Sequence, residues 1–302
     1  MSFFERLERH AALTEKRLYE LLTPCTDNEY SERCEKLFGA MRYSALGGGK
    51  RLRAFLVLQF CLAYGGKTED ALDYACAMEM MHAFSLIHDD LPAMDNDDMR
   101  RGKPSSHKAF GEATAILAGD ALAIDSLRVC ASNPNCSALQ NLEAVRCLAS
   151  HAGVLGMCTG QQLDLDGEGK KLDEEELTAL VMHKTGDLIA ASCFLGTLAA
   201  KEKLSGKERI LPLAFGHDIG LAFQIADDLL DIRSTSEQLG KTVGKDLAEE
   251  KSTFVSLLGE EGAAQKAAEA ISLAKKELAL LPDSVYKTEL YELCDYIIER
   301  KK

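Results

Sequence analysis

Apolar residues recur at helical spacing along almost the whole 302-residue chain. The pattern predicts helices over roughly 2–22, 28–43, 52–64, 69–90, 112–131, 138–157, 173–200, 208–232, 246–258, 262–281 and 284–301. No stretch alternates apolar and polar residues with a period of two, so essentially no sheet is expected. The chain holds only six prolines and no long Ser/Gly linker. We therefore expect an all-α fold in which residues 1–302 form one large helical bundle.

Four segments are apolar on several faces, which predicts that they lie in the centre of the bundle. They are residues 71–88, 113–124, 186–200 and 213–230.

Two aspartate clusters close two of these segments, one at Asp89, Asp90 and Asp95 and one at Asp227, Asp228 and Asp231. On a regular helix Asp227 and Asp231 share one face, about 6 Å apart along the axis. Pro92 ends or bends the first helix, so helical spacing does not place Asp95. Carboxylates this close repel one another unless a cation lies between them, and Mg²⁺ with phosphate oxygens is the natural partner. A solvated acidic helix end is the alternative for either cluster alone.

Basic residues gather in two short segments. Gly47-Gly48-Gly49-Lys50-Arg51-Leu52-Arg53 places three cations at a predicted helix start, where backbone N–H groups add positive potential. Arg100-Arg101 follows the first aspartate cluster, and adjacent guanidinium groups can engage two different phosphates. Both segments are candidate diphosphate sites, and a solvated basic loop is the alternative for each.

Several polar residues interrupt apolar helices or follow them. Lys184-Thr185-Gly186 lies inside a predicted helix, and a Thr-Gly pair there predicts a kink that frees a backbone carbonyl. Gln224 lies in an apolar run and needs a polar partner. His82 also lies in an apolar helix, where a core histidine bonded to a neighbour is the plainer interpretation. Lys241 lies in a Gly/Lys-rich loop and Lys251 follows it, which an ordinary surface loop would also explain.

Composition limits the kind of partner. The chain has 48 Asp and Glu against 35 Lys and Arg, a net charge of −13, which argues against nucleic acid or an anionic membrane as the main partner. No apolar run reaches the 18 residues of a membrane span, so no stable membrane insertion is expected. The N-terminus lacks a signal-peptide pattern, so we expect a cytoplasmic protein. The ten cysteines form no C-x-x-C pair, and we interpret them as small buried residues.

The motifs together resemble those of the short-chain trans-polyprenyl diphosphate synthases, most of all the bacterial farnesyl diphosphate synthases. Residues 85–108 resemble the first Asp-rich motif of the family in its longer form, and residues 223–233 with 239–247 resemble the second. The Gly-Gly-Lys-Arg-Leu-Arg run ending at Arg53 and the Lys184-Thr185 pair complete the set in family order. The resemblance implies an isoprenoid synthase-like helical bundle with a central cavity, and commonly a homodimer.

The resemblance also implies a reaction in which isopentenyl diphosphate is added head to tail to dimethylallyl or geranyl diphosphate. Three Mg²⁺ ions would bind the allylic diphosphate between two sets of ligands: Asp89, Asp90 and Asp95, and Asp227, Asp228 and Asp231. The same diphosphate would be held by Arg100, Lys184, Lys241 and Lys251, with oxygens near Lys184, Thr185 and Gln224 stabilising the allyl cation. Isopentenyl diphosphate would be bound by Gly49, Lys50, Arg53, His82 and Arg101.

Product length is expected to depend on the residues below the first cluster. On a regular helix Ser85 lies one turn beneath Asp89. The resemblance singles out the fifth residue before the first aspartate, where an aromatic is typical of farnesyl-forming members. Phe84 therefore favours a C15 product.

Three alternatives stay open at this point. The first is a geranylgeranyl diphosphate synthase. The second is a class I terpene cyclase, although its second metal motif is typically an Asn/Ser/Glu pattern. The third is a non-catalytic helical subunit, although such subunits often lose an aspartate cluster.

Overall fold

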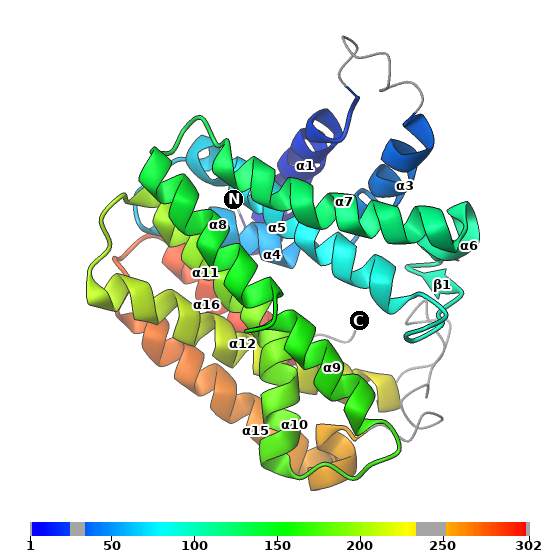
Figure 1. Ribbon diagram of the computed structural model, residues 1–302. Coiled ribbons are helices and arrows are strands. Elements are labelled where there is room, and N and C mark those ends of the chain that lie inside the picture. The colour runs from blue at the N-terminus through cyan, green and yellow to red at the C-terminus, as the bar shows by residue number, and fades with distance from the viewer. Residues whose placement is uncertain (1, 25–33, 234–251, 300–302) are drawn as a thin grey trace.

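The computed structural model describes residues 2–24, 34–233 and 252–299, and these form a bundle of helices (Figure 1). The helices are α1 (Phe3–Leu21), α3 (Glu35–Ala45), α4 (Leu52–Ala63), α5 (Thr68–Asp89), α6 (Ser106–Phe110), α7 (Glu112–Ala131), α8 (Ala138–Ala152), α9 (Met157–Gly167), α10 (Glu174–Val181), α11 (Asp187–Ala200), α12 (Gly206–Arg233), α15 (Phe254–Ala279) and α16 (Val285–Glu299). A π-helical turn, η1 (Met182–Gly186), joins α10 to α11. The strands in these ranges are β1 (Met99–Arg100) and β2 (Lys103–Pro104), an antiparallel pair. The predicted all-α fold is confirmed.

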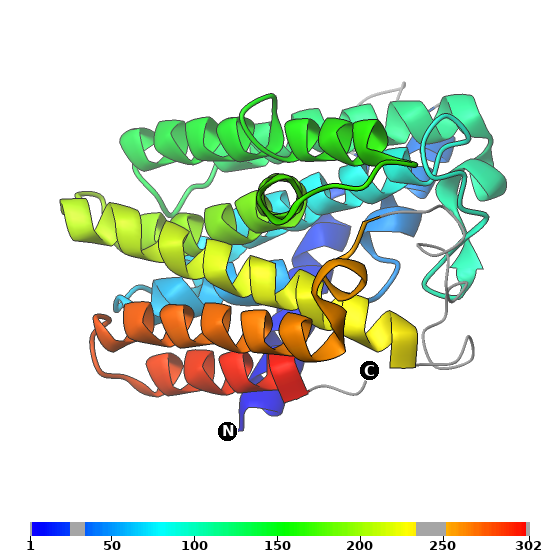
Figure 2. The ribbon, with the colours of Figure 1, turned by 90° about the horizontal axis from the view of Figure 1, so that it is seen from below.

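Helices α5, α11 and α12 run through the middle of the bundle. Figure 2 shows α8 and α9 along one edge and α15 and α16 along the opposite edge. Nearly every residue of α11 is buried, as the apolar segment 186–200 predicts. Helix α7 departs from the prediction for 113–124, because Ile116, Leu117 and Ile124 are exposed. No helix in the described ranges is long and apolar enough to cross a membrane.

The predicted helix 138–157 is wrong in its second part. Helix α8 ends at Ala152, and a new helix, α9, begins at Met157. A Cβ at Gly156 would collide with the carbonyl oxygen of His151, so only glycine fits this turn. The predicted break between 258 and 262 is present inside α15, where Gly259 has a φ of 70°.

Glycines let α12 approach the start of α11 closely. A Cβ at Gly220 would lie 2.8 Å from the Cα of Gly186, and one at Gly216 would collide with the backbone of Ala190. Gln224 and Asp228 continue the same four-residue spacing along α12. The close approach therefore brings these two polar side chains to η1.

We predict that Gly220→Ala will lower the free energy of unfolding by about 1–3 kcal/mol, because the added methyl overpacks a backbone contact. Denaturant unfolding of the purified protein measures this. Gly206→Ala is the control in the same helix, because a Cβ there meets nothing within 4 Å and should leave stability unchanged or slightly higher. A Gly220→Ala protein as stable as the wild type would contradict the close-packing argument.

Candidate active site

A cavity of about 500 Å³ opens between α4, α5, η1, α12 and α16. It brings together residues that the sequence singled out in segments far apart along the chain. They are Gly49, Lys50, Arg53, His82, Asp89, Asp95, Arg100, Arg101, Lys184, Thr185, Gln224, Asp227, Asp228 and Asp231. Lys241 and Lys251 lie outside the described residues. We call this space the polar cavity.

The first aspartate cluster is shaped by the end of α5. Asp89 is the last residue of the helix, and the chain then turns back so that the N–H of Asp95 donates to the carbonyl of Asp89 at 2.9 Å. The bend expected at Pro92 is therefore confirmed. Burial, together with the charges of Asp95 and Asp90, raises the pKa of Asp89 to about 6 against the opposing effect of Lys184 and Arg100.

The two clusters face the same cavity, but their carboxylates do not close on one point. Within the described ranges no group of three histidine, cysteine, aspartate or glutamate side chains is placed to hold a metal ion. A cation there would therefore need further oxygen ligands from water or a bound phosphate, which is the usual condition of Mg²⁺ in proteins.

Asp90 differs from the other members of its cluster. It is only 2% exposed and does not line the polar cavity. Its carboxylate accepts a hydrogen bond from Nε of Arg100 at 3.0 Å, and burial nevertheless raises its pKa. The structure therefore pairs Asp90 with Arg100, and its predicted role as a metal ligand stays a prediction.

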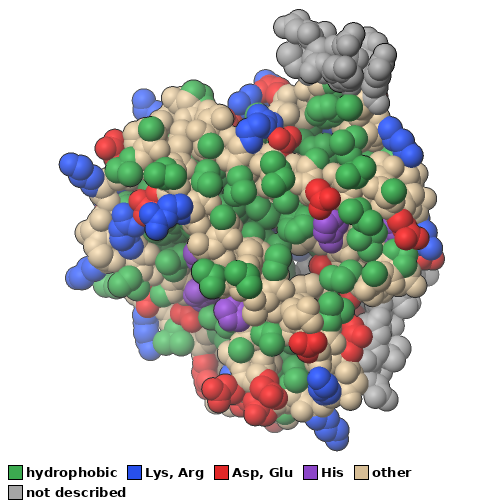
Figure 3. Space-filling model, in the orientation of Figure 1, with side chains coloured by type: hydrophobic (Ala, Val, Ile, Leu, Met, Phe, Trp, Pro, Cys, Tyr) green, Lys and Arg blue, Asp and Glu red, His purple; other side chains and the backbone are tan. Residues whose placement is uncertain are grey.

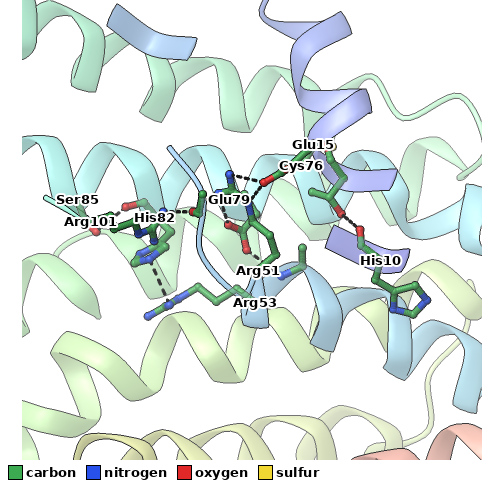
Figure 4. A network of polar contacts seen from close by, with 12 residues as sticks. His10, Glu15, Arg51, Arg53, Cys76, Glu79, His82, Ser85 and Arg101 are labelled. Atoms are coloured by element: carbon green, nitrogen blue, oxygen red, sulfur yellow. Dashed lines mark hydrogen bonds and ion pairs between the residues drawn. The ribbon is translucent and has the colours of Figure 1, made fainter. Parts of the chain in front are cut away.

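Residues of the two basic segments meet around Gly48 and Gly49. We call Gly49, Lys50, Arg53, His82 and Arg101 the arginine clamp. Arg101 has a φ of 53° and donates from its guanidinium to the carbonyl of Gly48. Gly49 has a φ of 109°, which L side chains rarely adopt, and this explains why glycine occupies the position; a Cβ there would also lie 2.9 Å from Cζ of Arg101. Nη1 of Arg53 lies 3.5 Å from Nε2 of His82 (Figure 4).

Burial governs the charges of this clamp. It lowers the pKa of Arg53 to about 10, although Glu79 partly offsets the effect. Burial and the neighbouring arginines, Arg53 first, lower the pKa of His82 well below its usual range. His82 is therefore neutral at pH 7 and can donate one hydrogen bond and accept another, while the arginines carry the positive charge.

The kink predicted at Thr185-Gly186 is present as the π turn η1. Nζ of Lys184 lies 2.6 Å from Oδ2 of Asp164, and the Thr185 hydroxyl donates to Oε1 of Gln224 at 3.3 Å. Nε2 of Gln224 in turn donates to Oδ1 of Asp228 at 3.0 Å. The predicted polar partner of Gln224 is therefore found, and a chain of hydrogen bonds connects η1 with the second aspartate cluster.

A second cavity of about 400 Å³ adjoins the first and shares Arg53, His82, Asp89, Lys184 and Thr185 with it. Phe84 and Ser85 line it, and so does one face of α9, contributed by Met157, Cys158, Gln161, Gln162 and Leu165. We call it the apolar cavity. The Phe84 ring meets the His88 ring edge to face at 4.9 Å. Both residues predicted to lie below Asp89 therefore line a space that begins at Asp89.

Sequence reasoning missed several residues of this site. Asp164 was not predicted because α9 itself was not, although Gly160-Gln-Gln-x-Asp in a glycine-rich stretch is a signal that could have found it. A Cβ at Gly160 would collide with the backbone of Lys184, so α9 packs directly on η1. Leu293, Tyr296 and Ile297 of α16 also line the polar cavity.

A cluster of imidazoles lies behind the π turn. Asp187, the first residue of α11, accepts hydrogen bonds from both sides: Nδ1 of His183 lies 2.9 Å from one oxygen and Nε2 of His217 lies 3.0 Å from the other. Burial raises the pKa of Asp187, but the bonds from His217 and His183 outweigh burial and lower it. Asp187 thereby ties η1 to α12.

Comparison with known proteins agrees with this geometry. The polyprenyl synthetase family profile matches residues 34–286. Farnesyl diphosphate synthase of Escherichia coli is 46% identical over 267 residues, 87% of this chain and 88% of that enzyme. Geranylgeranyl diphosphate synthase of Cyanophora paradoxa is 42% identical over 266 residues, 87% of each chain.

The match with solved structures of the same fold covers nearly the whole chain. The FPP/GFPP synthase of Zymomonas mobilis is 35% identical with a TM-score of 0.85, covering 98% of both chains. The geranyltransferase of Helicobacter pylori, complexed with magnesium and isoprenyl diphosphate, is 31% identical with a TM-score of 0.82, also covering 98% of both.

We predict that Asp187→Asn will lower the free energy of unfolding at pH 7 by about 1–3 kcal/mol, because it weakens two partly buried hydrogen bonds. The folded pKa of Asp187 is below its unfolded value, so its stabilisation is present above about pH 4 and is lost as the pH falls through the folded pKa. The difference from the wild type should therefore shrink in acid. Urea unfolding at pH 7 and in acid measures it.

The control is Asp166→Asn, because Asp166 is exposed and accepts one hydrogen bond from Gln162. It should change stability by no more than about 0.5 kcal/mol at either pH. Equal stabilities of Asp187→Asn and the wild type at pH 7 would contradict the tying role of Asp187.

Proposed function

This chain belongs to the polyprenyl synthetase family, and we propose that it condenses isopentenyl diphosphate head to tail with dimethylallyl or geranyl diphosphate to give farnesyl diphosphate. The observation that carries the proposal is the polar cavity, in which two aspartate clusters and a separate arginine clamp face the same space. One side of the cavity would bind a diphosphate through cations held by carboxylates, and the other side would bind a diphosphate directly through arginines. Two such sites suit two diphosphate substrates. The adjoining apolar cavity offers room for the prenyl chain of the allylic substrate.

The carboxylates fit divalent cations. Asp89 is crowded by Asp95 and Asp90, and a cation would relieve the repulsion that helps to raise its pKa. We propose that Mg²⁺, three ions with the allylic diphosphate bound, is held by Asp89, Asp90, Asp95, Asp227, Asp228 and Asp231. When bound, the metal stabilises negative charge on the departing diphosphate.

The chain's own cations act on the same leaving group. Arg100 and Lys184 lie at the cavity beside Asp89, where they stabilise the growing charge as the C–O bond ionises. Lys241 and Lys251 join this set in the proposal. The oxygens of Thr185 and Gln224, aligned by their hydrogen bond, face the allyl cation from η1 and α12.

The second substrate is assigned to the clamp. Gly49, Lys50, Arg53, His82 and Arg101 hold isopentenyl diphosphate so that its double bond attacks C1 of the allyl cation. The resulting tertiary cation loses a proton to the released pyrophosphate, and no side-chain base is proposed. The helix walls keep water from the cation.

A homodimer is part of the proposal. Helices α7 and α8 expose an apolar face at Ile116, Leu117, Ile124, Leu139 and Leu142. Figure 3 shows hydrophobic side chains gathered over the region where these helices lie. A second copy of the chain would cover such a face. A cytoplasmic location and one domain over residues 1–302 stay predictions from the sequence.

The function is tested by mixing the protein, Mg²⁺ and isopentenyl diphosphate with dimethylallyl or geranyl diphosphate. Pyrophosphate should be released, and EDTA should abolish the release. Asp227→Asn should lower kcat by roughly 100-fold, because it removes one carboxylate charge that would hold Mg²⁺ on the departing diphosphate. Asp283→Asn is the control, because Asp283 is fully exposed in an ion pair with Lys287. No release with either allylic diphosphate would sink the proposal.

A geranylgeranyl product is the second candidate, supported by a geranylgeranyl diphosphate synthase among the relatives at similar identity.

Phe84 favours the shorter product, and we predict that Phe84→Ala will extend it beyond C15, because the ring at the wall of the apolar cavity is removed. Chromatography of products from dimethylallyl, geranyl and farnesyl diphosphate measures the length. The matched control, Phe110→Ala, removes a ring that packs on Tyr43 outside this cavity and should keep C15. A C15-only product from Phe84→Ala would show that Phe84 does not limit the length of the product.

A further inference from the structure

A buried ion pair lies behind the arginine clamp. Nη1 of Arg51 is 3.2 Å from Oε2 of Glu79, and the two residues are 5% and 2% exposed (Figure 4). Arg51 comes from the start of α4 and Glu79 from the middle of α5. Neither residue belongs to the set that the resemblance assigns to the substrates, although Arg51 is one of the three cations of the basic segment 47–53. A charged pair removed from water at this depth stabilises the fold only if its geometry is well satisfied.

Glu79 also caps α4 from outside the helix. Arg51 is the N-cap residue, with φ 51° and ψ 41°, and its own side chain makes no capping hydrogen bond. Instead, Oε1 of Glu79 accepts the backbone N–H of Ala54 at 3.0 Å. A carboxylate at a helix N-terminus satisfies a free N–H group and interacts favourably with the helix dipole. One side chain of α5 therefore fixes both the backbone and the first cation of the α4 turn.

This connection sets the position of the clamp residues. Lys50 immediately precedes Arg51, and Arg53 immediately precedes Ala54. On α5, His82 lies three residues after Glu79 and therefore on the same face. The 3.5 Å contact between Arg53 and His82 joins these two helices at the cavity. A shift of Glu79 against the α4 turn would move the clamp residues on one helix relative to those on the other.

Glu79 binds one arginine of the clamp region, Arg51, so that the donors of Arg51 are used within the protein. Arg51 directs Nη1 to Glu79, and it directs Nε and Nη2 to Glu15 of α1 at 3.2 and 3.1 Å. Its donors are therefore engaged by carboxylates. Arg51 and Glu79 line the polar cavity, as Arg53 and Arg101 do, but all three guanidinium nitrogens of Arg51 are bound by carboxylates. The negative charge of Glu79 also opposes the loss of charge that burial imposes on Arg53.

We infer that Glu79 and Arg51 are positioning residues for the diphosphate of isopentenyl diphosphate. They hold Lys50, Arg53 and His82 in place without contributing a donor to the substrate themselves. This inference rests on the proposed function and deepens it, because it names what keeps one of the two diphosphate sites in shape. The allylic site is held by different contacts, at η1 and α12, so the two sites should respond separately.

The test is steady-state kinetics of the full chain with Glu79→Gln and with Arg51→Lys. Glu79→Gln keeps side-chain size and Arg51→Lys keeps the positive charge, but both weaken the pair, because glutamine is neutral and lysine lacks the guanidinium fork. The KM for isopentenyl diphosphate should rise roughly tenfold or more, as expected when a buried charge-assisted contact is lost. The KM for geranyl diphosphate should stay within about twofold, a split that general loosening of the fold would not produce.

Glu15→Gln is the matched control, because Glu15 binds the same guanidinium from a half-buried position, with 41% of its side chain accessible, whereas Glu79 is buried. It should change both KM values by less than about twofold. Thermal unfolding identifies any variant that does not fold. If Glu79→Gln does not fold, the KM values of Arg51→Lys test the inference.

Two results would overturn the inference: an unchanged KM for isopentenyl diphosphate in a folded variant, or an equal rise in both KM values. Failure of the proposed function looks different, because the wild-type protein would then release no pyrophosphate at all.

Discussion

Charge buried inside a helical bundle is the constraint on which the rest of this structure depends. The acidic side of the polar cavity holds Asp89 with a pKa raised to about 6, and the basic side holds Arg53 with a pKa lowered to about 10. Both shifts mean that the charged forms are poorly solvated where they lie. Each side is relieved by the opposite charge, cations on one and phosphate oxygens on the other. The cavity is therefore prepared for ligands of both signs before any ligand binds.

Fixed partners hold charged residues of the site in place, both those that serve only the structure and those proposed to bind ligands. Arg51 is held by Glu79, and Arg100 hydrogen-bonds Asp90 at the back of the first cluster. The backbone is irregular at or beside these residues, since Arg51 and Arg101, the neighbour of Arg100, have positive φ. Such conformations cost energy and persist because the surrounding packing determines them. The regular helices supply that packing.

The sequence predicted the parts of the site whose signal is local. Clustered aspartates, glycines before cations and a Thr-Gly pair inside a helix each conflict with an ordinary helix over a few residues, so each is visible in one segment. Glu79 and Asp164 are single acids on helices, and neither segment shows which residue the acid binds. Their partners lie 28 and 20 residues away, and only the fold brings them together. The pairing of Asp90 with Arg100 is likewise a result of how the β1–β2 hairpin returns to α5.

Helix α9 links the two cavities mechanically. Its Gly160 packs against the backbone of Lys184, its Asp164 binds the ammonium of Lys184, and its Met157 and Cys158 form a wall of the apolar cavity. Widening the apolar cavity by moving α9 would therefore displace a cation of the proposed ionisation site. Phe84 lines the same cavity from α5, where its ring packs edge to face on His88. Under the proposed function, product length can change through α5 without disturbing Lys184, whereas a change through α9 alters both length and ionisation.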